Sequence, residues 1–146
     1  MSKNKLTFSK PSLKELSERE YLITNGLGGY SSSTVCSLNT RKYHGLLVIA
    51  ENPPTDRKVL VSKLEETIIT PNENLDISTA QYPGNVYPTG FNFLHSFEVS
   101  PFPKQEYKTE KKSLSKTTFM EHGSNTTIVK YQNTGKKSIT IKVTPH

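Results

Sequence analysis

Two short segments of this chain concentrate residue types that bind or transform small molecules. Residues 24–30 (Thr-Asn-Gly-Leu-Gly-Gly-Tyr) hold three glycines within four positions, which lets the backbone turn sharply or approach a ligand closely. Residues 39–45 (Asn-Thr-Arg-Lys-Tyr-His-Gly) place Arg41, Tyr43 and His44 directly before an apolar run. Planar donors for hydroxyl groups, together with an aromatic face for a sugar ring, suit a polyhydroxylated ligand.

Each segment also has a purely structural interpretation. The Gly-x-Gly-Gly spacing is followed by a strand pattern and not by a helix, so it is not a dinucleotide-binding fingerprint, and a simple turn is the alternative. Arg41 would then tie down the glycine turn by donating to its carbonyl groups, and His44 would be a hydrogen-bonded histidine of the core. The sequence alone leaves both interpretations open.

The chain offers no obvious pair of carboxylates for acid–base catalysis and no metal site. Glu65 and Glu66 are neighbours on a predicted strand, so they point to opposite faces and cannot act on one bond. Glu18 and Glu20 flank the end of a predicted helix, where we expect them in solvent. Four dispersed histidines do not have metal-ligand spacing, and no cofactor is predicted. One of them, His95, is expected in the core.

An aromatic segment follows in the middle of the chain. Tyr82, Tyr87 and Phe91 are interleaved with Pro83-Gly84 and Pro88, which stiffen the backbone. We expect a rigid loop whose rings either pack on the protein or stack on a sugar.

Length and composition set the class of protein. A chain of 146 residues fits one domain with a core that needs no disulfide, and the single Cys36 fits a reducing compartment. The polar N-terminus is not a signal peptide, and no apolar run reaches membrane-spanning length. We therefore expect a soluble, cytoplasmic protein with no membrane partner.

The net charge of +6 arises in the last third of the chain. Residues 1–100 carry 10 basic and 10 acidic side chains, whereas residues 101–146 carry 9 and 3. Only three basic residues are arginines, and the late lysines are spread at strand-like spacing. A solvated sheet face is the favoured interpretation and no nucleic acid is expected as a partner. The alternative is a free-standing module whose basic face binds an anionic partner.

The hydrophobic pattern predicts a mainly β protein with one short N-terminal helix. Ser12 and Glu15 form a capping box that starts this helix. The predicted strands are Tyr21–Thr24, Thr34–Leu38, His44–Ala50, Lys58–Thr70, an alternating strand after Gly90, Tyr107–Glu121 at an edge, and Thr126–Gln132 and Ser138–Thr144 as a hairpin around 133–136. After Gly90, residues Phe91, Phe93, His95, Phe97 and Val99 are expected on one face. Short strands with regular turns favour an antiparallel β-sandwich.

Several sequence blocks, in order, resemble one family. They are 20–30 (Glu-Tyr-Leu-Ile-Thr-Asn-Gly-Leu-Gly-Gly-Tyr), 39–48, 53–54 with 59–66, 87–97, 114–120, 125–131 and 141–145. Together they resemble the N-terminal domain of bacterial and archaeal glycogen debranching enzymes of the amylo-alpha-1,6-glucosidase type. The chain departs from the family pattern at Tyr21, where a Trp is common, and at Lys42, where a second Arg is common.

The resemblance implies a supersandwich-like domain over 20–146, after a tail and short helix over 1–19, with the domain cut short at its C-terminal end. It implies a helical-toroid catalytic domain as a partner, which carries the carboxylates that hydrolyse α-1,6-linked glucose in glycogen. This chain itself would have no catalytic residue, but it would pack on the toroid and contribute to binding α-glucan. The expected substrate-binding or interface residues are Asn25, Gly28, Gly29, Asn39, Arg41, Tyr43, His44 and Tyr87.

Overall fold

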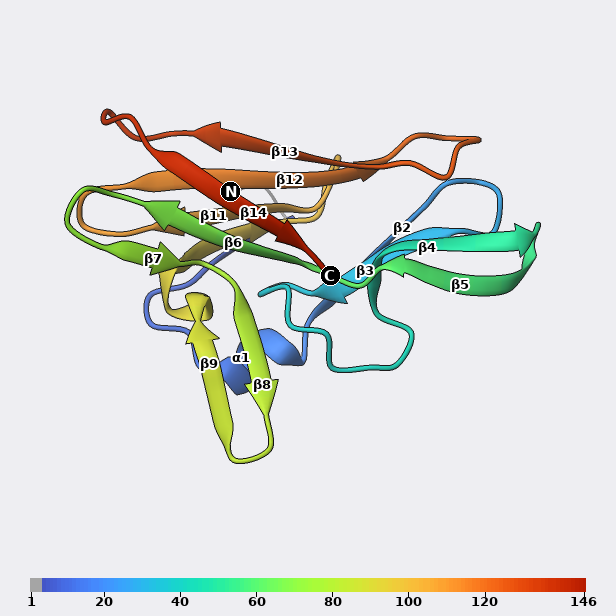
Figure 1. The fold of residues 1–146 in the computed structure, drawn as a ribbon, viewed down its shortest axis with the longest axis horizontal. Coiled ribbons are helices and arrows are strands. Elements are labelled where there is room, and N and C mark those ends of the chain that lie inside the picture. Colours follow the sequence, from blue (N-terminus) through green and yellow to red (C-terminus); the bar gives the residue numbers. More distant parts are fainter. Residues whose placement is uncertain (1–3) are drawn as a thin grey trace.

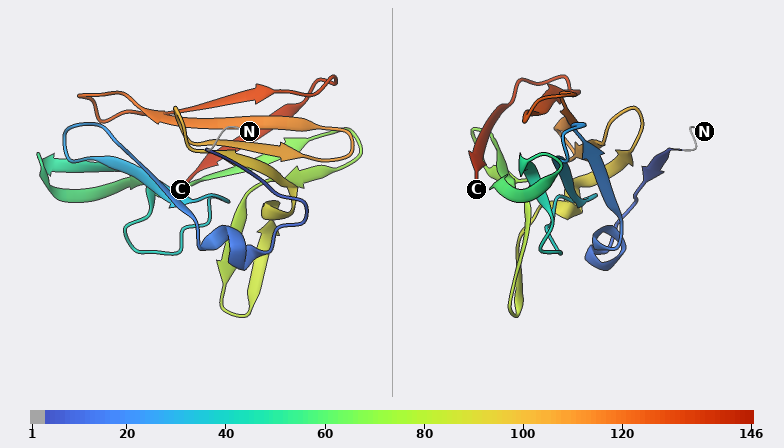
Figure 2. Two further views of the ribbon diagram at one scale, coloured as in Figure 1. Left: turned by 180° about the vertical axis from the view of Figure 1, so that it is seen from behind. Right: turned by 90° about the vertical axis from the view of Figure 1, so that its right-hand side faces the viewer.

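The chain folds into four antiparallel sheets in this computed structural model, which describes residues 4–146 (Figures 1 and 2). The five-stranded sheet has the order β1 (Lys5–Thr7), β10 (Leu94–Glu98), β11 (Lys104–Lys108), β12 (Ser113–Met120) and β13 (Thr127–Asn133). The three-stranded sheet has the order β14 (Thr140–Pro145), β6 (Leu64–Ile69) and β7 (Asn74–Asp76). The four-stranded sheet runs from β2 (Glu20–Thr24) through β3 (Tyr30–Thr34) and β4 (Gly45–Asn52) to β5 (Thr55–Val61).

The remaining elements are small. Strands β8 (Thr79–Tyr82) and β9 (Asn85–Thr89) pair only with each other, and they project from the body at the bottom of Figure 1. The helix α1 (Leu13–Ser17) begins where predicted, because the Ser12 hydroxyl accepts a hydrogen bond from the Glu15 amide at 3.1 Å. A 3₁₀ turn, η1 (Gly90–Phe93), precedes β10. The prediction of a mainly β, antiparallel fold with a short N-terminal helix is confirmed.

The core lies between the five-stranded sheet and the three-stranded sheet. Ile68 of β6 belongs to the same buried cluster as Leu114 of β12 and Leu94 of β10. Leu16 of α1, which is completely buried, belongs to the same cluster. Opposed apolar faces of this kind are the packing of a sandwich. The four-stranded sheet continues to one side of the core, at the right of Figure 1.

A buried charge pair joins these two layers. Lys116 of β12 and Glu66 of β6 form an ion pair, and their side chains are only 4% and 1% exposed. The Tyr131 hydroxyl donates to the same carboxylate at 2.8 Å, and the Ser78 hydroxyl lies 3.2 Å from its other oxygen. Buried charges are tolerated when they are paired and hydrogen-bonded in this way. The prediction that the late lysines lie on a solvated face is thus wrong for Lys116, whereas the opposite orientation of Glu65 and Glu66 is confirmed.

Two strand boundaries differ from the predicted ones in the first half of the chain. The second strand covers Tyr30–Thr34 and not Thr34–Leu38, because residues 35–38 form a turn that buries its apolar side chains. The Thr34 hydroxyl closes this turn by donating to the Leu38 carbonyl at 2.8 Å and accepting from the Leu38 amide at 3.0 Å. The predicted strand 58–70 is two strands, β5 and β6, because the chain passes from one sheet to another at Ser62 and Lys63.

Two predictions for the second half of the chain are also wrong. The segment 107–121 is not one edge strand: Thr109 closes a turn on Lys112, and β12 lies between β11 and β13. Residues 133–136 do not make a hairpin, because β13 and β14 belong to opposite layers and β14 pairs with β6. The chain crosses between layers there.

The alternating strand predicted after Gly90 begins only at Leu94. Gly90 packs so closely on the Ile77 carbonyl that a Cβ would lie 2.1 Å from its carbon, and a 3₁₀ turn follows. In β10 the buried side chains are those of Leu94, Ser96 and Phe97, whereas His95 is only half-buried and not a core residue.

Candidate functional site

The glycine turn between β2 and β3 is held by one buried amide side chain. The Asn25 Oδ1 atom accepts from the backbone amides of Leu27 at 2.9 Å and Gly29 at 3.0 Å. Its Nδ2 atom donates to the Ser124 carbonyl at 3.1 Å and to Asn125 Oδ1 at 3.0 Å. Asn25 therefore closes the turn from behind and fastens it to the β12–β13 connection.

Two glycines of this turn are required by backbone conformation and by space. Gly26 has φ +80°, and a Cβ on it would lie 2.4 Å from the His122 ring. Gly28 has φ +91°, and a Cβ on it would lie 2.6 Å from the Pro54 carbonyl oxygen. The turn is thus packed between the β4–β5 turn and the β12–β13 turn, in a conformation that side chains with a Cβ rarely adopt.

An open groove of about 520 Å³ runs beside the turn over the four-stranded sheet. Its lining is Leu22, Thr24, Gly26, Gly28, Gly29, Tyr30, Tyr43 and Arg57. Leu22 is 64% exposed and Tyr43 is 47% exposed, which leaves apolar and aromatic surface open to a ligand. The guanidinium carbon of Arg57 lies over the Tyr30 ring, 6.0 Å from the ring centroid, and Arg57 Nε donates to the Gly28 carbonyl at 2.9 Å. We call this hollow the glycine-turn groove.

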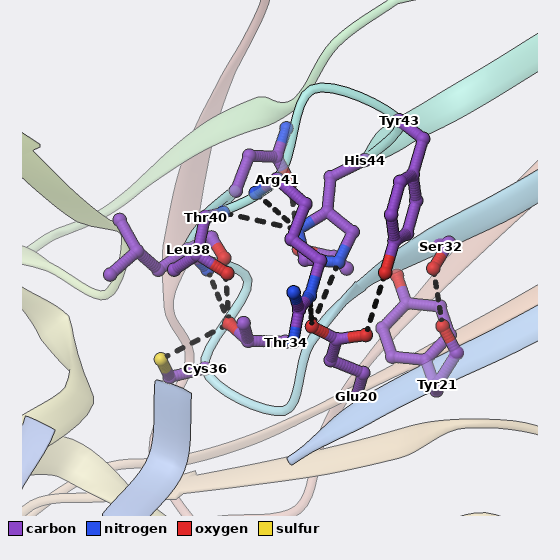
Figure 3. A network of polar contacts seen from close by, with 12 residues as sticks. Glu20, Tyr21, Ser32, Thr34, Cys36, Leu38, Thr40, Arg41, Tyr43 and His44 are labelled. Carbon is purple, nitrogen blue, oxygen red and sulfur yellow. Dashed lines mark hydrogen bonds and ion pairs between the residues drawn. The ribbon is translucent and has the colours of Figure 1, made fainter. Parts of the chain in front are cut away.

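Next to Tyr43 of the groove lining, polar side chains of the 39–45 loop converge on Glu20 (Figure 3). Arg41 Nε donates to Glu20 Oε1, and the Tyr43 hydroxyl donates to Glu20 Oε2 at 3.4 Å. His44 Nε2 lies 3.5 Å from Glu20 Oε1. Residues 41, 43 and 44 thus converge on one carboxylate, which comes from β2 at the start of the four-stranded sheet.

The hydrogen bonds of His44 define its tautomer. The Thr40 amide donates to His44 Nδ1 at 3.0 Å, so Nδ1 is an acceptor and the proton of the neutral ring lies on Nε2, toward Glu20. Burial lowers the pKa of His44 below its ordinary value. The hydrogen bond from Arg41 lowers the pKa of Glu20. At neutral pH the group is therefore an anionic Glu20 between a cationic Arg41 and a neutral His44.

The structure divides the predicted site residues among three places. Gly28, Gly29 and Tyr43 line the groove, and Arg41 and His44 adjoin it through Glu20. Asn25 lies behind the turn, with its amide used inside the chain. The other two lie elsewhere: Asn39 donates to the Ser62 carbonyl at 2.9 Å, and Tyr87 is on the projecting β8–β9 hairpin.

Sequence reasoning missed four residues of this site: Glu20, Leu22, Tyr30 and Arg57. Glu20 was expected in solvent and is an exposed residue, but its carboxylate also holds Arg41. The alternation of Glu20, Leu22 and Thr24 along β2 was the available signal, since it places all three on one face. In the structural interpretation, Arg41 was expected to donate to a carbonyl group of the glycine turn. In the structure, Arg57 donates to the Gly28 carbonyl instead.

The lining of the groove combines apolar, aromatic and backbone surface with one arginine. Glycoside hydrolysis needs two carboxyl groups facing one bond, one of them able to donate a proton. The lining of the groove contains no carboxylate, and Glu20 beside it is held in its ionised form by Arg41. Apolar and aromatic surface with charged groups at its end can hold a ligand by its faces and hydroxyl groups.

A larger hollow of about 1040 Å³ lies among the β6–β7 turn, the β11–β12 turn and the β13–β14 connection. It has mixed charge, because its lining contains Lys111, Lys112 and Lys137 together with Glu73 and Glu110. Lys112 donates to the Ser138 carbonyl at 3.1 Å. This surface therefore does not form a single basic patch.

Comparison with known proteins gives one match. The family model described as glycogen debranching enzyme N terminal matches residues 19–146. No curated protein and no solved structure gives a significant match. Within residues 4–146, no helix is long and apolar enough to cross a membrane.

Proposed function

Because the chain belongs to the family of glycogen debranching enzyme N-terminal domains, we propose that it binds branched α-glucan at the glycine-turn groove and does not itself cleave it. The groove supports this more than any other surface does, because it exposes Leu22 and Tyr43 beside fixed polar groups. The carbon–hydrogen face of a glucose ring packs on such apolar and aromatic surface, while its hydroxyl groups need donors and acceptors.

Arg41 supplies the hydrogen-bonding end of this proposed site. Its side chain is 58% exposed, although its Nε atom is bound to Glu20. A guanidinium group has five N–H donors in a fixed fork, so one bond to Glu20 leaves others for sugar hydroxyls. The glycine turn forms one wall of the groove, where backbone without side chains allows a ring to approach closely.

We further propose that hydrolysis occurs in a separate domain of the same enzyme, a helical toroid that is the partner of this chain in the cytoplasm. The lowered pKa of Glu20 supports a catalytic site in another domain. A general acid must hold a proton near neutral pH, whereas Glu20 is ionised there. The domain described here would then present the branched polymer to that partner.

Titration of the chain with a branched malto-oligosaccharide tests the binding. We expect a measurable heat at millimolar ligand, and a Tyr43→Ala variant that binds at least about threefold more weakly because the ring face is lost. Phe102→Ala is a matched control, since Phe102 is 43% exposed in the β10–β11 connection, outside the groove. Absence of heat in the wild type contradicts glucan binding, and release of glucose from a limit dextrin contradicts the non-catalytic role.

A further inference from the structure

The β8–β9 hairpin stands apart from the rest of the surface in shape and composition. Its strands form a sheet of their own, and Figure 1 shows it projecting from the body. At its tip, a Cβ added to Gly84 would meet no other atom within 4 Å. Residues 79–89 (Thr-Ala-Gln-Tyr-Pro-Gly-Asn-Val-Tyr-Pro-Thr) contain no charged side chain, whereas 22% of the whole chain is charged.

Two tyrosines are the most exposed aromatic side chains of this region. Tyr82 is 57% exposed and Tyr87 is 62% exposed. Tyr82 pairs with Asn85, and exposure alternates along β9 so that Asn85, Tyr87 and Thr89 are the exposed positions. Asn85 shares a face with its partner Tyr82, and Tyr87 is the next exposed position along β9, at the point where the register with β8 shifts between Thr79 and Gln81.

The hairpin has a firm base, so its face is held and not loose. The Gly90 amide donates to the Ser78 carbonyl at 2.8 Å, and the Phe91 amide donates to the Thr79 hydroxyl at 2.9 Å. A small hollow of about 150 Å³ beside the base is lined in part by Asn39, Gln81 and Tyr82. The predicted site residue Asn39 therefore lies next to this hairpin and not in the glycine-turn groove.

We propose that the tyrosine face of this hairpin is a second contact for the same neutral polysaccharide, an inference that rests on the proposed function. The face offers two aromatic rings, the Asn85 amide and no charge, which matches the carbon–hydrogen faces, hydroxyl groups and neutrality of a glucan. Pairing of β9 with a strand of another protein is disfavoured, because Pro88 removes an amide from this strand.

A second contact changes which ligands bind well. The glycine-turn groove and the hairpin lie on different parts of the molecule (Figure 1), so a short oligosaccharide occupies one of them at a time. A long, branched polymer can occupy both, and the second contact then forms at a high effective concentration. The chain is therefore expected to prefer glycogen over short malto-oligosaccharides by more than a single site would allow.

Co-sedimentation of the whole chain with glycogen tests the hairpin separately from the groove. We expect a double variant, Tyr82→Ala with Tyr87→Ala, to bind glycogen at least about fivefold more weakly because two ring faces are lost. Tyr82→Phe with Tyr87→Phe keeps the rings and should bind nearly as the wild type does. Both tyrosines are exposed, so thermal unfolding of each variant should match the wild type.

The outcomes separate this proposal from the proposed function. If the double alanine variant binds glycogen as the wild type does while Tyr43→Ala weakens binding, the hairpin contact is wrong and the groove stands. If only the hairpin variant weakens binding, the groove is wrong and the hairpin stands. If the alanine variants change association with a protein and leave glycogen binding intact, the hairpin is a protein-docking surface and this inference is overturned.

Discussion

His44 directs its Nε2 atom at Glu20 Oε1 from 3.5 Å, with the His44 side chain completely buried and the Glu20 side chain 26% exposed. This distance is long for a hydrogen bond, so the contact is a weak one between a neutral imidazole and a carboxylate. The stronger bond of His44 is the one that Nδ1 accepts from the Thr40 amide. The histidine thereby closes the turn at residues 40–44 directly before β4, and the burial of its ring affects stability.

The burial of His44 is expected to make the folded chain less stable below pH 7. Because burial lowers the pKa of His44 in the folded chain, the unfolded chain binds the proton more readily. The contribution of His44 to the free energy of unfolding is then fully present above about pH 6.5, the ordinary pKa of histidine. It is lost as the pH falls through the pKa that His44 has in the folded chain. We expect urea denaturation at pH 7.5, 6.5, 5.5 and 5.0 to show this loss.

His44→Asn is the variant that isolates this effect. It keeps an acceptor near the Thr40 amide and cannot take up a proton in this range. It should be less stable than the wild type at pH 7.5, and its stability should vary less between pH 6.5 and 5.0. His122→Asn, at an exposed histidine of the β12–β13 turn, should retain the slope. A wild-type slope in the His44→Asn variant would show that another group titrates.

Glu20 is expected to act as a positioning residue for Tyr43 and Arg41. Glu20→Gln keeps the shape but removes the charge, and because Arg41 is mostly exposed the stability should fall by no more than about 1 kcal/mol. Affinity for branched malto-oligosaccharide should fall about threefold, since ring and guanidinium are less well held.

A double-mutant cycle distinguishes this role from a general loss of structure. In the Tyr43→Ala background, Glu20→Gln should weaken glucan binding less than it does alone, because one of the two groups that it positions is already gone. Equal effects in both backgrounds would mean that Glu20 does not act through Tyr43.

The sequence predicted the residue types at the site better than their arrangement. The loop 39–45 brings Arg41, Tyr43 and His44 to the mouth of β4 as expected, because the turn and the strand that follow are local features. The carboxylate on which they converge lies about twenty positions earlier. Such a partner is set by strand pairing across the sheet, which local patterns do not encode.

The errors in the fold have the same origin. The apolar residues of 35–38 have the pattern of a strand, but the Thr34 hydroxyl makes the bonds that end β3. The turn at 133–136 has the composition of a hairpin, yet β14 pairs with β6 because Ile141 joins the core from the opposite layer. Local composition identified the turn, and the packing of the two layers determined what it connects.

The buried pair Lys116 and Glu66 should be strongly sensitive to single substitutions. Lys116→Met leaves the Glu66 carboxylate without a counter-charge in the core, and Glu66→Leu leaves the Lys116 ammonium group without one. Each single variant should lose about 3–5 kcal/mol of the free energy of unfolding. The double variant should recover most of this loss, since two apolar side chains of similar volume replace the pair, although the Tyr131 hydroxyl loses its acceptor. Urea denaturation measures all three.

Lys142→Met is the matched control for that series, since Lys142 is an exposed lysine on β14. It should change the free energy of unfolding by no more than about 0.5 kcal/mol. If the double variant is as unstable as the less stable single variant, the hydrogen bonds of the pair contribute to the free energy of unfolding in addition to its charge balance.

Gly28 and Gly84 allow two effects of an added Cβ to be measured separately: the strain of a positive φ and the steric clash with neighbouring atoms. Gly28 and Gly84 have φ values of +91° and +78°, so alanine at either costs about 1 kcal/mol of backbone strain. Only at Gly28 does the new Cβ also meet backbone, 2.6 Å from the Pro54 carbonyl oxygen, while at Gly84 it meets open space. Gly28→Ala should therefore lower the melting temperature more than Gly84→Ala does. It should also weaken glucan binding, because the turn it displaces is a wall of the groove. Equal losses of stability would mean that the β4–β5 turn moves freely and that the glycine turn is not locked in place by Pro54.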